Sequence, residues 1–240
     1  MQIDKYTVPV LDHGFVKLRN ISGPTRRALQ EFDADDTDPA NSARMSFDAT
    51  DNVDRTREMD LRLASYLMKN KHTTPIEMVE CWIEMKIPIF VARQFVRHRT
   101  ATINEVSGRY IQLPSEFYIP EVVGGKASSA KQGQEDNLES TIQNWFKQEL
   151  NFLYEDMFGF YDEALRRGVA PEHARLALGL STYTHWLWKQ DLHNLLHFLS
   201  LRDHSHAQIE AQECAKGIDS LIRNVLPETM KLYDQHRKLN

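Results

Sequence analysis

The sequence is poor in cysteine: Cys81 and Cys214 are the only two in 240 residues, with neither a CxxC pair nor a spacing typical of metal ligands. This scarcity argues against a disulfide framework and favours a reduced, cytoplasmic protein. The chain also lacks a run of eighteen apolar residues, and Met1–Leu11 lack the charged-then-apolar order of a signal sequence. We therefore expect no membrane partner.

An excess of positive charge is missing as well. The formal net charge is −5, which argues against a protein that coats nucleic acid or an anionic membrane. With 41% hydrophobic and 26% charged residues, the composition is that of an ordinary soluble globular protein. The length fits one domain over residues 1–240 with a substantial core, and we find no internal repeat.

Hydrophobic periodicity predicts both strands and helices. The clearest strand is 79–87, where every second residue is apolar, and further β-structure is predicted at 15–21 and 181–188. Helices are predicted at 56–71, 88–99, 137–167, 171–180 and over most of the chain from Asp191 onward, with breaks near Arg202–Ser205 and at Pro227. Long helices with a few strands that do not alternate strictly with them indicate the α+β class.

Three connecting segments complete this prediction. We expect Pro75 to stop the helix before it, so that residues 72–77 form a turn or the start of a strand. Residues 100–109 are expected to form an ordered polar loop. Residues 124–136 are rich in Gly, Ser and Gln and are typical of a mobile surface loop.

Positive charge is nevertheless concentrated in one segment, RHRTATINEVSGRY at 97–110, which holds three arginines, a histidine and one glutamate. The preceding helix sets Arg93 and Arg97 on one face and ends in basic residues, where the helix dipole favours cations. Arginine binds phosphate or carboxylate bidentately, and Gly108 lets backbone amides approach an anion closely. The segment indicates an anion site, and a solvated basic helix end paired with nearby acids is the alternative.

The same segment resembles the signature of the flavin-dependent thymidylate synthases, RHRxxSxNExSxRY, and departs from its specified positions only at Thr102. Other stretches are similar to blocks of that family, namely HTTPIE, FVARQFVRHR, EFYIP, HARLALGL and LSLRDHSHAQ. The resemblance covers most of the chain, and segment 124–136 falls where the family varies. It implies the fold of the thymidylate synthase-complementing proteins, a small mixed or antiparallel sheet with several long helices.

The resemblance also implies an enzyme that converts dUMP to dTMP. Methylenetetrahydrofolate donates the one-carbon unit in this family, and FAD reduced by NADPH supplies the hydride. No cysteine nucleophile is used, which agrees with Cys81 on the apolar face of a strand and Cys214 within a helix, away from groups that activate a thiolate. The family further implies a homotetramer whose active sites draw on several subunits.

Carried over by position, a set of residues is implied to bind dUMP: Gln94, Phe95, Val96, Arg97, Glu105, Val106, Ser107, Gly108, Arg109, Arg175 and Arg202. Arg175 is expected to reach the substrate from another subunit, and its alternative is an ion pair on a helix surface. Arg202 matches the arginine proposed to activate the pyrimidine, which makes it the implied catalytic residue. From the sequence alone, an ion pair with Asp203 or another acid is an equally simple role for it.

A second implied set binds FAD: Thr74, Arg97, His98, Arg99, Glu105, Asp191, Leu192, His193 and His197, with His72 and His206 as further neighbours. The pyrophosphate of the cofactor explains why cations gather here. At 191–197 many members of the family carry Asn-x-Arg and a later Asn instead. The loss of an arginine there predicts a looser grip on FAD.

Two other functions remain open on residue chemistry. His193 and His197 are four residues apart, and Asp203, His204, His206 and Glu210 follow, which can hold a metal in a hydrolase. This cluster lacks the HExxH order and does not explain the arginines, so we predict no metal. A non-catalytic nucleotide-binding module would need only residues 97–109.

Overall fold

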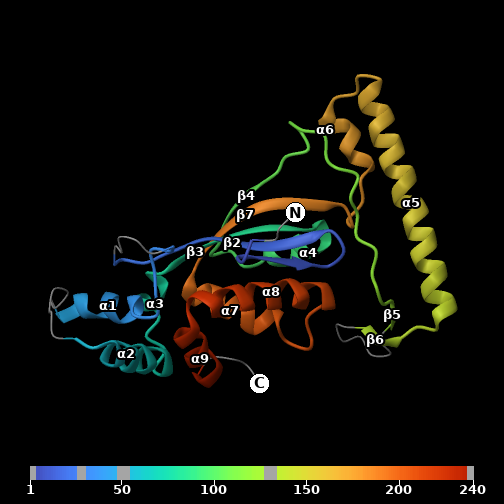
Figure 1. Cartoon of the computed structure of the whole chain (residues 1–240). Coiled ribbons are helices and arrows are strands. Elements are labelled where there is room, and N and C mark those ends of the chain that lie inside the picture. The colour runs from blue at the N-terminus through green and yellow to red at the C-terminus, as the bar shows by residue number, and fades with distance from the viewer. Residues whose placement is uncertain (1–3, 26–30, 48–54, 127–133, 237–240) are drawn as a thin grey trace.

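The computed structural model describes residues 4–25, 31–47, 55–126 and 134–236 (Figure 1). Its main sheet is antiparallel throughout, in the order β1-β2-β3-β7-β4. These strands are β1 (Thr7–Val10), β2 (Gly14–Ser22), β3 (Glu80–Pro88), β7 (Tyr183–Asp191) and β4 (Thr102–Glu105). A separate hairpin pairs β5 (Gly124–Lys126) with β6 (Gln134–Asn137).

The helices are α1 (Asp38–Arg44), α2 (Arg57–Lys69), α3 (Thr74–Glu77), α4 (Ile89–Phe95), α5 (Ser140–Arg166), α6 (Pro171–Ala174), α7 (Leu192–Arg202), α8 (Ile209–Val225) and α9 (Pro227–His236). Short 3₁₀ turns follow two of them, η1 (Met45–Phe47) and η2 (Arg175–Ala177). The α+β class is therefore confirmed, and so are the predicted breaks between the C-terminal helices.

The main sheet has one covered face and one open face. Cys81, Ile83 and Met85 of β3 are fully buried, whereas the alternating Glu84 and Lys86 are only half-buried. α7 and α8 pack on the covered face (Figure 1). Among the described residues, no long helix packs across the other face. The period-two pattern of residues 79–87 is thus confirmed, because it separates the core from an exposed polar surface.

The helix α5 stands away from the sheet and forms an arm together with α6 and η2 (Figure 1). A second, smaller core holds this arm together, and in it Phe117 stacks on Tyr154 with ring centroids 5.0 Å apart. Gly168 follows the end of α5 with φ of +84°, as its predicted capping role requires. The prediction of a long helix at 137–167 is confirmed with a later start.

The basic segment is folded differently from the prediction. The helix expected at 88–99 ends at Phe95, so Arg97–Arg99 lie in the following turn. The loop expected at 100–109 contains β4, in which Thr102 pairs with Lys189 of β7. The Thr100 hydroxyl accepts a hydrogen bond of 2.9 Å from Gln190 at the start of this pairing. The helix is confirmed over Ile89–Phe95 and the loop over 106–109, and the rest of each expectation was wrong because pairing with a distant strand overrides local periodicity.

Two further boundaries differ. The helix α2 ends at Lys69, and two residues later Lys71 adopts a positive φ of 59°. Pro75 does not stop this helix but lies in the first turn of the next one, α3. The helix expected at 171–180 ends at Ala174 and passes into η2. The chain then turns so that the Ser181 amide donates to the Tyr154 hydroxyl at 2.7 Å. Within the predicted mobile loop, the flanks form the β5–β6 hairpin, and residues 127–133 lie outside the described residues.

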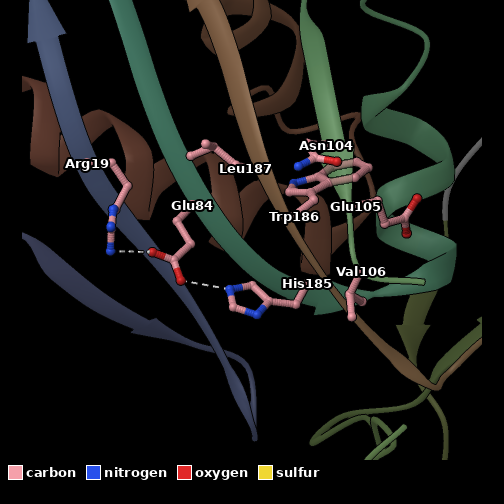
Figure 2. A pocket seen from close by; sticks show the side chains of 8 residues that line it. All are labelled: Arg19, Glu84, Asn104, Glu105, Val106, His185, Trp186 and Leu187. Carbon is pink, nitrogen blue, oxygen red and sulfur yellow. Dashed lines mark hydrogen bonds and ion pairs between the residues drawn. The ribbon is translucent and has the colours of Figure 1, made fainter. Parts of the chain in front are cut away.

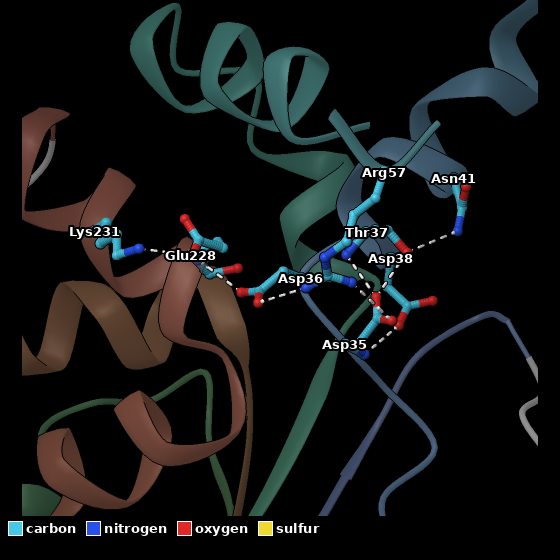
Figure 3. Close-up of polar contacts among 9 residues, drawn as sticks. Asp35, Asp36, Thr37, Asp38, Asn41, Arg57, Glu228 and Lys231 are labelled. Atoms are coloured by element: carbon cyan, nitrogen blue, oxygen red, sulfur yellow. Dashed lines mark hydrogen bonds and ion pairs between the residues drawn. The ribbon is translucent and has the colours of Figure 1, made fainter. Parts of the chain in front are cut away.

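A buried carboxylate ties the N-terminal helices to the C-terminal one (Figure 3). Asp36, 1% exposed, accepts the Thr229 amide in the first turn of α9 at 2.7 Å. Arg57 at the start of α2 lies 3.3 Å from the other oxygen of Asp36. The carboxylate therefore caps one helix and holds another, and neither this link nor α1 and β1 was predicted.

Candidate functional site

The side chain of Arg202 lies where α4 and α7 both end. Its Nε donates a hydrogen bond to Nε2 of His98 at 3.1 Å, and its Nη2 donates to the backbone oxygen of Gln94 at 3.2 Å. Arg202 is half-buried, and burial lowers its pKa. We refer to Gln94, His98 and Arg202 as the Arg202 group.

The partners of Arg202 are neutral. Burial, followed by the neighbouring charges of Arg202 and His197, lowers the pKa of His98 to about 4. At neutral pH the imidazole is therefore uncharged, and its Nε2 accepts the hydrogen bond from Arg202. Of the carboxylates in the described ranges, none forms an ion pair with Arg202. Arg202 therefore does not form the ion pair with Asp203 that the sequence left open as an alternative.

The other residues between Gln94 and Arg99 differ in how exposed their side chains are. Arg97 and Arg99 are exposed, and neither forms a salt bridge with an acid in the described part of the chain. Phe95 is fully buried against Phe198, so only its backbone atoms can reach a ligand, whereas Val96 packs on the same core and is partly buried. The Gln94 side chain donates to Gln208 at 2.6 Å and thereby joins α4 to the start of α8.

Of the predicted substrate segment Glu105–Arg109, the last residues contact the arm. The Arg109 amide is 3.3 Å from the Ser107 hydroxyl, and Arg109 Nε lies 3.0 Å from a Glu172 carboxylate oxygen of α6. About half of each side chain in this ion pair is exposed. We refer to Ser107, Gly108, Arg109, Glu172 and Arg175 as the arm group.

Gly108 is packed tightly against the arm. A Cβ atom there would lie 3.0 Å from Cδ1 of Leu113 and 3.3 Å from Cδ of Arg175. The absent side chain therefore lets the backbone of the motif approach η2 of the same chain. Arg175 lies beside Gly108 within one subunit, and its expected contact with substrate from another subunit stays a prediction. Arg175 forms no salt bridge with an acid among the described residues, although the sequence alternative for this arginine was an ion pair on a helix surface.

Glu105, implied in binding both ligands, is the last residue of β4 and lies opposite Trp186. Its carboxylate accepts a short hydrogen bond from the hydroxyl of the buried Thr184, and the next amide, of Val106, donates to His185 at 2.8 Å. Sequence reasoning missed Thr184. The available signal was a small polar residue that alternates with Trp186 and Trp188 on the inward face of the strand.

The open face of the sheet contains a pocket of about 370 Å³ (Figure 2). A polar chain crosses it, since Glu84 contacts Arg19 at 3.1 Å and His185 at 2.8 Å. The pocket is lined by residues of four strands: Arg19, Glu84, Asn104, Glu105, Val106, His185, Trp186 and Leu187. Arg19, Glu84 and His185 were missed as well, because only the strand register brings them together.

Several of the residues implied in FAD binding lie on α7, at its N-cap or on α3, which packs against α7. Thr74 opens α3 and is exposed, and His197 is exposed on α7. Asp191 caps α7 by accepting the Asn194 amide at 2.9 Å and the Asn194 side chain at 2.8 Å. Leu192 is fully buried and its amide donates to Val79, so its side chain cannot reach a ligand.

The histidines still to be placed are His193 on α7, His206 and His72. His193 is half-buried and has an interaction partner. His206 stacks on His204 with ring centroids 5.0 Å apart, and His72 lies beside Tyr66 at 5.8 Å. In the part of the chain that the structure describes, no group of three or more His, Cys, Asp or Glu could hold a metal ion. The metal-hydrolase alternative therefore has no ligand set among these residues.

Both thiols are buried, and burial raises the pKa of each above its ordinary value. A thiolate nucleophile at neutral pH is therefore strongly disfavoured at Cys81 and Cys214. No helix among the described residues is long and apolar enough to cross a membrane.

Comparison with known proteins identifies the family. The profile described as thymidylate synthase complementing protein matches residues 28–228. A flavin-dependent thymidylate synthase of Treponema denticola is 39% identical over 232 residues, covering 95% of this chain and 82% of that protein. One of Thermus thermophilus is 40% identical over 230 residues, covering 96% and 79%.

A solved structure agrees with these relatives. The UMP/dUMP methylase PolB from Streptomyces cacaoi, bound with 5-Br dUMP, superposes with a TM-score of 0.80 at 26% identity, covering 97% of this chain and 99% of that one. The chain therefore belongs to the thymidylate synthase complementing family, the family of the flavin-dependent thymidylate synthases.

Proposed function

We propose that this protein is a flavin-dependent thymidylate synthase that methylates dUMP to dTMP. Its co-substrates are methylenetetrahydrofolate and NADPH, and its cofactor is FAD. One observation carries the proposal: the half-buried Arg202 has only neutral partners, and both partners, Gln94 and His98, belong to the FVARQFVRHR block that identifies the family. The proposed location is the cytoplasm, in keeping with two free, buried cysteines.

The arm group binds the phosphate of dUMP in this proposal. Arg109 and Arg175 supply guanidinium groups, and Gly108 keeps the backbone close to them. Gln94–Arg97 and Glu105–Val106 complete the substrate contacts, through backbone atoms in the case of Phe95. The exposed ion pair with Glu172 contributes only about 0–1 kcal/mol, so that phosphate can replace it at little cost.

Arg202 activates the pyrimidine. Because neither thiol can add to the ring, electron density must be drawn to C5 by stabilising negative charge on the N3 side of the base. A guanidinium removed from bulk water and not neutralised by a carboxylate stabilises this charge strongly. Each unit by which the pKa of the base is lowered requires about 1.4 kcal/mol, and one charged hydrogen bond supplies roughly 1.5–3 kcal/mol.

The residues around α7 fit FAD. Arg97 and Arg99 are exposed cations without acidic partners among the described residues, which suits a pyrophosphate. Thr74, His98, Glu105, Asp191–His193 and His197 complete the proposed set. When bound and reduced by NADPH, FAD supplies the hydride. The task of this chain's residues is to hold dUMP, orient it and stabilise its charge.

The complete site requires more than one copy of the chain. α6 lies on one side of the sheet and α7 on the other, so the arm group and the Arg202 group of one subunit face different regions (Figure 1). The arm exposes large apolar side chains, including Trp145, Phe152, Phe160 and Leu176. We assign this surface to contacts within a homotetramer, in which the arm group of one copy meets the Arg202 group of another.

Release of tritium from [5-³H]dUMP tests this function. Methylenetetrahydrofolate, NADPH and FAD together should give tritium release and dTMP, and omission of FAD should abolish both. Tritium release that persists in FAD-free protein would contradict the flavin assignment. Binding of dUMP without any turnover would instead identify the alternative, a nucleotide-binding module.

A further inference from the structure

His98 contacts Arg202 directly, and this contact assigns it a second role beyond FAD binding. We propose that His98 is a positioning residue for Arg202: its imidazole fixes the plane of the guanidinium so that one edge remains open to the pyrimidine. The inference rests on the proposed function and goes beyond it, because it explains how the activating arginine is held.

The hydrogen-bond pattern leaves the terminal edge of Arg202 open. Nε donates to His98 and Nη2 donates to Gln94, and both donors lie along one side of the planar guanidinium. Nη1 and the second hydrogen of Nη2 form the terminal edge, and Nη1 has no hydrogen-bond partner among the residues described. This edge presents two parallel N–H groups, the geometry that binds a planar acceptor bidentately.

His98 is itself held rigidly by the core. Its ring meets Phe198 edge to face with centroids 4.9 Å apart, and Phe198 also contacts Phe95 at 4.8 Å and Trp188 at 5.0 Å. These three aromatic residues are fully buried. An arginine side chain has several rotatable bonds, so a fixed acceptor on its Nε limits the orientations of the guanidinium before substrate arrives.

The chemical identity of the acceptor matters as well. A carboxylate on Nε would position the guanidinium equally well, but it would also neutralise the charge that the substrate requires. The imidazole of His98 is uncharged because it is buried beside Arg202. A neutral acceptor therefore positions Arg202 without reducing its positive charge.

Substitutions at position 98 separate this role from FAD binding. His98→Phe keeps a ring against Phe198 and removes the acceptor, whereas His98→Gln retains an acceptor of similar reach. At saturating FAD, with bound FAD measured by absorbance, we expect His98→Phe to lower kcat for tritium release about 10- to 100-fold, the effect of one charged hydrogen bond. The KM for dUMP should change less than kcat, and His98→Gln should recover most of the lost kcat.

A double-substitution cycle tests whether His98 acts through Arg202. Arg202→Lys removes the Nε donor, so adding His98→Phe to it should lower kcat only slightly further. Wild-type kcat in His98→Phe, no recovery in His98→Gln, or an undiminished effect in the Arg202→Lys background would each overturn the inference. Absence of turnover in the wild-type protein would refute the proposed function instead, so the two failures are distinguishable.

Discussion

Arg202 and Arg109 place the same guanidinium group in two contrasting regions of the molecule. Arg202 is half-buried at the end of α7 and has two neutral partners. Arg109 lies on the arm, where about half of its side chain is exposed and its Nε pairs with Glu172. Arg202 joins the core, whereas Arg109 lies in a turn that is ion-paired to α6 of the arm.

In the proposed function, this difference in environment separates binding from chemistry. Coulombic interactions are several times stronger in a region shielded from water than at a surface, so Arg202 is suited to charge that develops during the reaction. The surface pair of Arg109 and Glu172 contributes little and exchanges readily for another anion. We therefore expect changes at Arg202 to act mainly on kcat and changes at Arg109 to act mainly on the KM for dUMP.

The largest expected effect is that of Arg202→Ala. Loss of a preorganised charge donor should lower kcat about 10²- to 10³-fold, while FAD remains bound. Tritium release and the flavin absorbance of the purified protein measure these two quantities. Near-normal turnover would remove Arg202 from the chemistry and the contrast with Arg109 would fail.

Arg109→Ala should have the next largest effect. We expect the KM for dUMP to rise about 10- to 100-fold through loss of charged hydrogen bonds to phosphate, with kcat at saturation changed far less. Because about half of the Arg109 side chain is exposed, added salt should weaken dUMP binding more in the wild type than in this variant. Glu172→Gln is the matched control and should change the KM only a few-fold. A fall in kcat with unchanged KM would reverse the proposed division.

Asp191→Ala should act on stability. The carboxylate caps α7, the helix that carries Arg202, and loss of such a cap costs about 1 kcal/mol. For a chain of this size the melting temperature should fall by about 2–4 °C. Asp191→Asn keeps a capping oxygen and should melt close to the wild type in the same scan. Equal melting temperatures for Asp191→Ala and the wild type would show that the cap contributes nothing.

The smallest expected effect on chemistry is that of replacing both thiols. The reaction depends on guanidinium charge in this account, so Cys81→Ala together with Cys214→Ala should leave kcat unchanged. Burial raises the pKa of both thiols, so a thiol reagent should not label the native protein at neutral pH. Loss of turnover in a folded double variant would restore the thiolate mechanism.

Elements specified by their own hydrophobic periodicity could be predicted, whereas elements that depend on pairing with a distant strand could not. β3 and α5 follow from periodicity, because burial of one face by itself specifies them. β4 could not be predicted, because its strand conformation depends on pairing with β7, which lies far along the chain. The early end of α4 has the same origin, since residues 96–101 must lead into this pairing.

The sequence proposed the candidate site as a set of residues but could not give their arrangement. The motif identified Ser107–Arg109 and the family resemblance identified Arg202. Neither could identify His98 as the partner of Arg202, because 104 residues separate the two in the chain. The packing of Arg175 on Gly108 and the contact of Thr184 with Glu105 likewise require tertiary structure.

Subunit complementation tests most directly whether two copies complete one site. Arg202→Ala and Arg109→Ala subunits are unfolded, mixed in equal amounts, refolded together and assayed at a dUMP concentration where each variant alone is slow. If the two arginines of one site come from different copies, the mixture should regain about a quarter of wild-type activity, the statistical share of unmutated sites. Activity no higher than the average of the two separate variants would contradict a shared site.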